Sequence, residues 1–167
     1  AKPGAGKTGN PEARDAVAAF GPSAGRGASA DDEAAPRPGG TPKEQFEHAF
    51  SLVTKADYAA AEKALAAFVE THPTDPQAGN AQYWLGRTYF VRKDYTQAAK
   101  AFAKVYEKYP KSAKAPNSVL DLGLSLAGLG DPQKACQAFN HLDIKFPNAA
   151  PDVKQREAVE KRRLGCK

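Results

Sequence analysis

Few residues in this sequence could do chemistry, and they do not form a catalytic group. The histidines are His48, His72 and His141, and none has a cysteine, an acid or a second histidine at a convincing metal-ligand spacing. Catalysis requires a nucleophile, a base and an electrostatic stabiliser in one pocket. The sequence offers no such constellation, so we expect no catalytic residue, no metal site and no cofactor.

A glycine-rich segment near the start resembles the end of a phosphate-binding loop. Residues 4–8 read Gly-Ala-Gly-Lys-Thr, but the full pattern needs a glycine five residues before Gly6, where Ala1 stands. The pattern also needs a preceding buried strand, which the surrounding residues do not encode. We therefore do not expect a nucleotide site.

Composition and charge exclude several classes of protein. The chain has 167 residues, of which 41% are apolar and 26% are charged, which is typical of one folded domain. No run of about 18 apolar residues occurs, so we expect no membrane-spanning helix. The net charge is +5, and the basic excess lies in the segment from Asp152 onward, which holds six basic residues and three acids. A nucleic-acid reader needs a broader basic face, so we expect no nucleic-acid partner.

The composition changes near residue 42. Residues 1–42 hold 14 of the 27 glycines and prolines, with Val17 and Phe20 as their only sizeable apolar side chains. Such a segment buries too little surface to offset its backbone entropy, so we predict a disordered linker, in which a short helix over 11–20 could form. The chain begins at Ala1 and contains no methionine, so we expect a processed product or a fragment.

Residues 43–167 repeat with a period of 37 residues. Matching positions hold Asp57, Asp94 and Asp131; Ala61, Ala98 and Ala135; Leu65, Phe102 and Phe139; and the pairs 72–73, 109–110 and 146–147, each ending in proline. Each unit reads as two helices, the second capped by the aspartate and closed before the proline. We predict an all-α solenoid of three helix-turn-helix repeats, at about 43–75, 76–112 and 113–149, with a capping helix over 151–164 closed by Gly165.

The first helices of stacked repeats line one face, which we call the inner face. By register, its side chains are Lys43, Phe46, Phe50, Val53, Asn80, Tyr83, Arg87, Phe90, Asn117, Leu120 and Leu124. We expect this face to bind an extended or helical segment of a partner, and we expect Arg87→Ala to weaken binding with little effect on the thermal midpoint. The competing interpretation is ordinary packing with a solvated rim. Trp84 either packs between units or makes an exposed contact, and packing is favoured.

The cysteines Cys136 and Cys166 leave two states open, one disulfide or two free thiols. Counted from the turn at 147–151, Cys136 lies about 12 residues before and Cys166 about 17 after. At about 1.5 Å of helix rise per residue, this difference places the two cysteines about 7 Å apart along the helix axis. Gly165 lets the chain leave the helix at that point. A bridge is therefore geometrically plausible, and it would pin the last helix.

These columns resemble the tetratricopeptide repeat. The second unit carries Leu85, Gly86, Tyr89, Ala98, Phe102 and Pro110, and the third carries Leu122, Gly123, Ala135, Phe139 and Pro147. The first unit keeps Ala61 and Pro73 but has Ala49 in place of the glycine. The period exceeds the usual 34 residues, and we expect the additional residues in 74–77 and 111–114.

Residues 41–166 further resemble the C-terminal domain of the YbgF/CpoB family, through the segments 80–86, 109–112, 122–126 and 163–166. Members are periplasmic proteins of Gram-negative bacteria that work with the Tol–Pal system, and some have a cysteine pair. The resemblance implies binding to TolA and coordination of outer-membrane constriction with a bifunctional peptidoglycan synthase. It also implies a trimeric full-length parent and a monomeric fragment, because no heptad pattern precedes residue 42.

The function expected from these observations is that of a non-enzymatic periplasmic adaptor. One alternative is a repeat module that recruits envelope enzymes through glycan contact, which favours exposed aromatic side chains. Another is a cytosolic peptide clamp, which a disulfide between Cys136 and Cys166 would count against.

Overall fold

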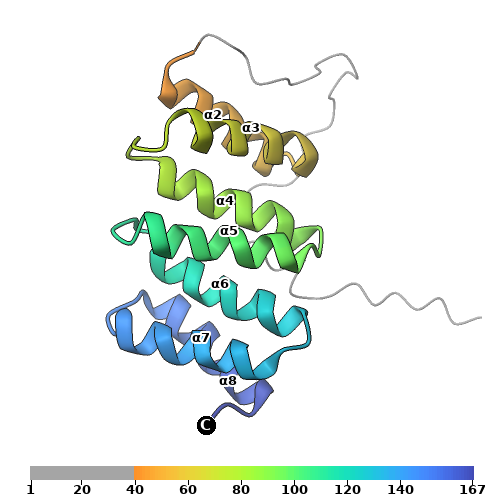
Figure 1. Ribbon diagram of the computed structural model, residues 1–167, viewed down its shortest axis with the longest axis vertical. Helices are drawn as coiled ribbons and strands as arrows, with labels where there is room; N and C mark the ends of the chain where they lie inside the picture. The colour runs from red at the N-terminus through yellow and green to blue at the C-terminus, as the bar shows by residue number, and fades with distance from the viewer. Residues whose placement is uncertain (1–39) are drawn as a thin grey trace, which may run out of the picture.

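A computed structural model describes residues 40–167 as helices stacked in chain order along the long axis of the molecule (Figure 1). The helices are α2 (Pro42–Thr54), α3 (Tyr58–Thr71), α4 (Ala78–Val91), α5 (Tyr95–Lys108), α6 (Ala115–Gly128), α7 (Pro132–Lys145) and α8 (Pro151–Leu164). No strand occurs in this part of the chain. The predicted all-α array of three hairpins and one terminal helix is confirmed.

The first helix begins earlier than the composition indicated. Pro42 is the first residue of α2, and Thr41 is its N-cap, although both fall in the predicted linker. The Glu44 amide donates to Thr41 Oγ1 at 3.2 Å, and the Thr41 amide donates to Glu44 Oε2 at 2.8 Å. This reciprocal capping box overrides the proline-rich composition locally. The rest of the predicted linker, with its possible helix, lies outside the described residues.

Each second helix starts in the same way. Asp57, Asp94 and Asp131 are the N-caps, and each accepts a hydrogen bond from the amide three residues later at 3.0–3.2 Å. The residue before each cap has a left-handed backbone, with φ of 60° at Ala56, 63° at Lys93 and 80° at Gly130. One turn geometry therefore closes all three hairpins, and two of the three turns hold a residue other than glycine in a region that favours glycine.

The two helices of a hairpin approach each other at a glycine. A Cβ added to Gly86 would lie 2.6 Å from the ring of Phe102, and one added to Gly123 would overlap the ring of Phe139. Both rings are fully buried. The first repeat has Ala49 in place of the glycine and Leu65 in place of the phenylalanine. The side chain that replaces Phe is smaller, which leaves room for the methyl group of the alanine. The glycines are thus needed for the close approach of a phenyl ring.

The additional residues of the 37-residue period lie in the connections between repeats. Tight turns fill them, with the Asp75 amide donating to the His72 carbonyl at 3.1 Å and the Ser112 amide donating to the Tyr109 carbonyl at 2.9 Å. The His72 ring packs on Phe68, with the centroids 5.1 Å apart, and its Nε2 lies 2.9 Å from Gln45 Oε1. These contacts join the end of α3 to the start of α2.

The glycine contact gives a first prediction. Gly86→Ala should lower the free energy of unfolding by about 1–3 kcal/mol, because the new methyl group must displace a buried ring. Chemical denaturation measures this. Gly40→Ala is the control, since its added Cβ would meet only the flexible side chains of Glu44, at 3.2 Å, and Gln45, at 3.9 Å. An unchanged stability of Gly86→Ala would show that Phe102 moves aside freely.

Candidate functional site

The predicted inner-face residues all lie on the first helices of the repeats. Four are on α2, four on α4 and three on α6, and α4 is in contact with both of the others. The structure therefore brings residues that are up to 81 positions apart in the sequence onto three neighbouring helices. Whether this face binds a partner stays a prediction.

Burial divides the predicted residues into two groups. The buried group is Phe46, Val53, Tyr83, Arg87, Phe90, Leu120 and Leu124. Phe50, Asn80 and Asn117 are half-buried, and Lys43 is exposed. The apolar strip read from the sequence is therefore largely packing, as the competing interpretation held, and the accessible part of the face is its half-buried and exposed rim.

A buried ion pair joins α4 to α6 within this face. Arg87 Nη1 lies 3.0 Å from Asp121 Oδ2, and the two side chains are 5% and 3% exposed. The Tyr83 hydroxyl donates to the same carboxylate oxygen at 3.0 Å. From the sequence, we expected Arg87 to contribute to binding with little effect on stability. The structure corrects this expectation, because removing one partner of a buried pair leaves an uncompensated charge.

The environment of this pair keeps it charged. Burial alone lowers the pKa of Arg87, but the negative charge of Asp121 and the Tyr83 hydroxyl raise that pKa above its ordinary value overall. Burial and the nearby Asp121 carboxylate also raise the pKa of the Tyr83 hydroxyl well above its ordinary value. Tyr83 therefore remains a neutral donor, and Arg87 remains a cation.

Beside the ion pair, aromatic rings from two repeats meet a lysine from the third. The Trp84 ring contacts Phe50 edge-on with the centroids 5.0 Å apart, and it contacts Tyr83 at 5.3 Å. Lys114 Nζ lies 5.3 Å from the centre of the Tyr83 ring and 5.7 Å from that of Trp84. We call Phe50, Tyr83, Trp84 and Lys114 the aromatic–lysine cluster. An ammonium over a ring face is attracted by the ring quadrupole.

The expectation that Trp84 packs between units agrees with its exposure of 4%. Lys114 was not predicted from the sequence. Lys114 is the N-cap of α6 and offers no side-chain oxygen to the helix amides. A lysine where a cap usually stands was the available signal.

Asn80 adds a polar group to the same face. It precedes Tyr83 by three residues and so lies next to it along one side of α4. Its Nδ2 donates to Gln77 Oε1 at 3.1 Å, while its Oδ1 is buried and accepts no hydrogen bond in the described part of the chain. Because this oxygen is buried, Asn80 offers a partner only the half-buried outer part of its side chain.

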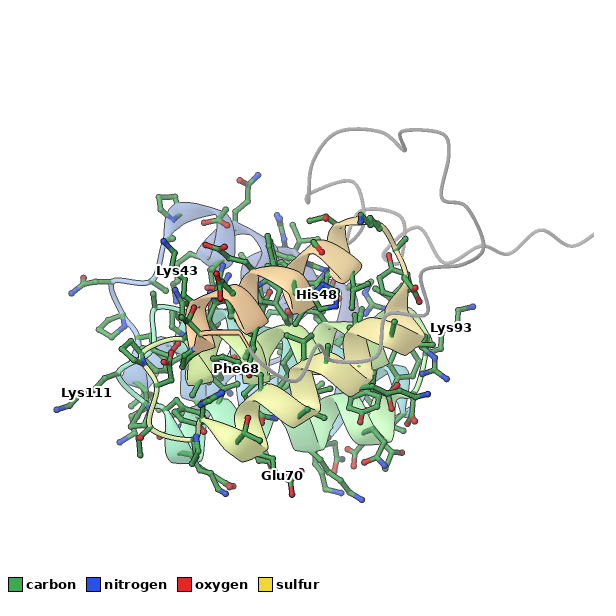
Figure 2. The ribbon with its side chains drawn as sticks, turned by 90° about the horizontal axis from the view of Figure 1, so that it is seen from above. Lys43, His48, Phe68, Glu70, Lys93 and Lys111 are labelled. Carbon is green, nitrogen blue, oxygen red and sulfur yellow. A yellow bond between two sulfur atoms is a disulfide. The ribbon has the colours of Figure 1, made fainter. Side chains whose placement is uncertain are left out.

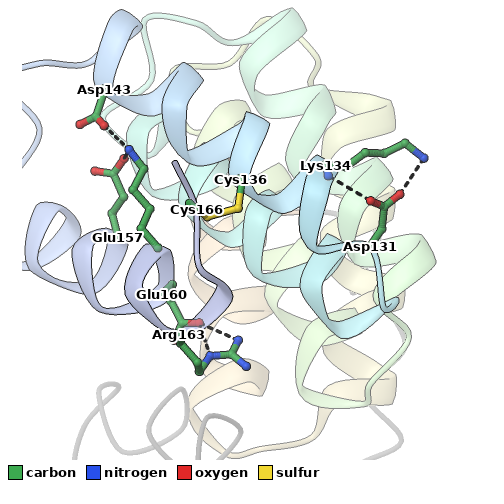
Figure 3. The surroundings of a disulfide bond; sticks show 9 residues. Asp131, Lys134, Cys136, Asp143, Glu157, Glu160, Arg163 and Cys166 are labelled. Atoms are coloured by element: carbon green, nitrogen blue, oxygen red, sulfur yellow. Dashed lines mark hydrogen bonds and ion pairs between the residues drawn. A yellow bond between two sulfur atoms is a disulfide. The ribbon is translucent and has the colours of Figure 1, made fainter.

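The two cysteines form a disulfide between Cys136 of α7 and Cys166, which follows α8 (Figure 3). Their Cα atoms are 5.4 Å apart. Gly165 ends α8 with φ of 68°, the left-handed exit that the sequence indicated. A cross-link over 30 residues stabilises a fold by about 3–4 kcal/mol in the chain-entropy account.

Elsewhere the described residues offer little for chemistry or membrane insertion. Residues 40–167 contain no group of three or more histidine, cysteine or acidic side chains that could hold a metal ion. In the same range, no helix has both the length and the apolar character that crossing a bilayer requires. Two open hollows of about 350 Å³ lie on α4 and α5 and between α5, α6 and α7, away from the aromatic–lysine cluster.

Comparison with known proteins identifies the repeats. Residues 46–113 match one tetratricopeptide-repeat family model, and residues 118–149 match a second. The chain is also 38% identical over 58 residues to two curated sequences from Pseudomonas putida, one of them from strain KT2440, each named cell division coordinator CpoB. This similarity covers 34% of the chain and 22% of the length of these relatives.

The buried ion pair gives a second prediction. Arg87→Ala should lower the free energy of unfolding by about 3–5 kcal/mol, because Asp121 would remain buried without its counter-charge. Replacing both partners, with Arg87→Met and Asp121→Leu together, should restore part of the loss, while the Tyr83 hydroxyl still loses its acceptor. Thermal and chemical denaturation measure both.

Arg92→Ala is the matched control for that series. Arg92 pairs with Glu62 at the surface, where its side chain is 51% exposed, and such a pair stabilises by less than about 1 kcal/mol. If Arg87→Ala costs no more than Arg92→Ala, the pair between α4 and α6 does not hold the inner face together.

Proposed function

Because the chain belongs to the tetratricopeptide-repeat family, we propose that it is a non-catalytic module that binds proteins of the bacterial envelope. The proposal places it in the periplasm, with TolA and a bifunctional peptidoglycan synthase as partners. Its role is to coordinate outer-membrane constriction with peptidoglycan synthesis during division. The similarity to curated coordinators of cell division supports this role, and the disulfide supports an oxidising compartment. The proposal further includes a trimeric full-length parent.

The observation that carries the proposal is the aromatic–lysine cluster. Each of the three repeats contributes to it, with Phe50 from α2, Tyr83 and Trp84 from α4, and Lys114 from the start of α6. A partner seated there would contact the whole array at once. Phe50 and Lys114 are half-buried, so both a ring edge and a cation remain accessible.

Charge indicates what kind of segment fits. Lys114 makes no ion pair with an acid in residues 40–167, and its ammonium is held over two rings. Lys43 adds a second, exposed cation on α2, which lies 3.9 Å from Glu47 of the same helix. We infer that the partner presents an acidic side chain or carboxylate flanked by apolar residues, as an extended or helical segment.

The same geometry weighs against the two alternatives. Sugar recognition uses the open face of an aromatic ring, but Tyr83 and Trp84 are 3% and 4% exposed. A cytosolic clamp would lie in a reducing compartment, where a bridge between Cys136 and Cys166 is not expected to persist. Binding of an envelope protein is therefore the function that the face supports best.

Lys114→Glu gives the third prediction. It should weaken binding to purified TolA about tenfold or more. The substitution replaces the cation above the rings with a carboxylate, which repels an acidic partner. Titration calorimetry measures the affinity. Trp84 is the single tryptophan of the chain, so its fluorescence reports binding at the same place.

Lys111→Glu is the matched control for that charge reversal. Lys111 stands three residues earlier, is exposed, and lies at the edge of the molecule in Figure 2. Its reversal should leave the affinity unchanged. Equal weakening by both variants would mean that only net charge matters, and absence of binding by the unaltered chain would reject TolA as the partner.

A further inference from the structure

The terminal helix α8 buries a different kind of surface from the first helices of the three repeats, α2, α4 and α6. Its buried side chains are Val153, Glu157 and Glu160, so only one of them is apolar. Helix α6, stacked one repeat earlier, buries Val119, Leu120 and Leu124 along with its small residues. Apolar burial is the main term that holds helices together, so α8 is the helix that packing holds least.

Ion pairs supplement this weak packing. Asp143 of α7 accepts hydrogen bonds from Lys154 and Lys161 of α8, and these two lysines also pair with Glu157 at 2.9 and 3.5 Å. Figure 3 shows Asp143 and Glu157 facing each other across one lysine side chain. Asp143 is 46% exposed, and the two lysines are 30% and 22% exposed. Water and salt therefore screen this network, and it does not replace the missing apolar contacts.

The disulfide is a further attachment, and it lies at the end of the helix. Cys136 lies in the first turns of α7, while Cys166 lies two residues beyond the end of α8. Helix α8 is thus held at its first residue by the connection from α7 and at its far end by the bridge. Both cysteines are half-buried, so the bond lies near the surface of the last repeat and not in the centre of the core.

We propose that the bond between Cys136 and Cys166 is a reversible modification site for a dithiol, and that its reduction releases α8 from the last repeat. A thiolate of the dithiol attacks one sulfur, the bond between the two cysteines breaks, and the other sulfur leaves and takes up a proton. The second thiol of the reagent then displaces the first cysteine. The dithiol becomes a disulfide, and the chain gains two electrons and two protons.

The rest of the array does not depend on this bond. The hairpins α2–α3, α4–α5 and α6–α7 each have their own buried rings or leucines, among them Phe68, Phe102 and Phe139. Reduction should therefore change the length of the ordered array by one helix, without unfolding the repeats.

Hydrogen exchange of the whole chain, followed by mass spectrometry, tests the proposal. With dithiothreitol as the dithiol, the amides of 151–164 should exchange about 100-fold faster than in the oxidised protein, while those of α4 and α5 change less than about threefold. The double variant Cys136→Ser with Cys166→Ser should show the fast exchange without reductant and no further response to it.

Two results would overturn the proposal. Unchanged protection of 151–164 after complete reduction, verified by the mass of alkylated cysteines, would mean that packing and ion pairs suffice to hold α8. Loss of protection throughout α4–α7 would mean that the bond stabilises the whole array and does not control one helix.

Acid should act on the reduced protein in the same place. Hydrogen bonds from Lys154 and Lys161 lower the pKa of Asp143 below its ordinary value of 3.8. A carboxyl whose pKa is lower in the folded state stabilises that state above its ordinary pKa, and this contribution is lost as the pH falls through the lowered value. The groups facing Asp143 are the two lysines of α8, which Glu157 also faces.

We therefore expect α8 of the reduced protein to lose further protection below about pH 4, after correction for the intrinsic exchange rate. The oxidised protein should keep its protection there. Asp143→Asn in the reduced protein should make this change between pH 7 and acid smaller, because one of the two carboxylates that face the lysines is gone. A reduced protein whose α8 is equally protected at both pH values would show that the network contributes nothing.

Discussion

The array depends on one contact within a hairpin, in which a phenylalanine ring of the second helix packs directly on a glycine of the first helix. Gly86 faces Phe102 and Gly123 faces Phe139, and in each case a single added carbon would overlap the ring. This contact sets how closely the two helices of a hairpin lie. Because consecutive hairpins stack through the same helices, it also sets where α4 stands relative to α6. The meeting of Arg87 with Asp121 follows from that spacing.

The inner face serves two purposes that use different residues. Its centre is interior: the ion pair and most of the apolar side chains are buried, and they fix the relative positions of the repeats. Its rim is accessible, with Lys43, Phe50, Asn80 and Lys114 exposed or half-buried. A partner that binds the rim therefore meets a rigid support, and binding need not order the face first.

Much of the fold could be predicted from the sequence because helix ends depend on local chemistry. Aspartate caps, prolines after the last turn and the glycine at 165 each act within a few residues of their own position, and the caps and prolines recur with one period. The start of α2 was misplaced because composition was read over the whole segment, while a capping box at Thr41 acts over three residues.

The site was harder to predict because its contacts join distant positions. Arg87 and Asp121 are 34 residues apart, and nothing in either local sequence shows that the two side chains face each other. Lys114 reaches the rings of α4 only because the connection between α5 and α6 places the start of α6 beside them. The burial of Tyr83 and Phe90 likewise depends on neighbouring helices, and periodicity cannot distinguish a buried stripe from an exposed one.

The three hairpin turns have a further consequence. Their left-handed residues, Ala56, Lys93 and Gly130, occur at one interval and join equivalent helices, whatever side chain they carry. Duplicating or deleting one whole unit in the gene would therefore create junctions of the kinds that the chain already contains. Such a protein family can change the reach of its recognition surface in discrete steps during evolution, without inventing a new interface.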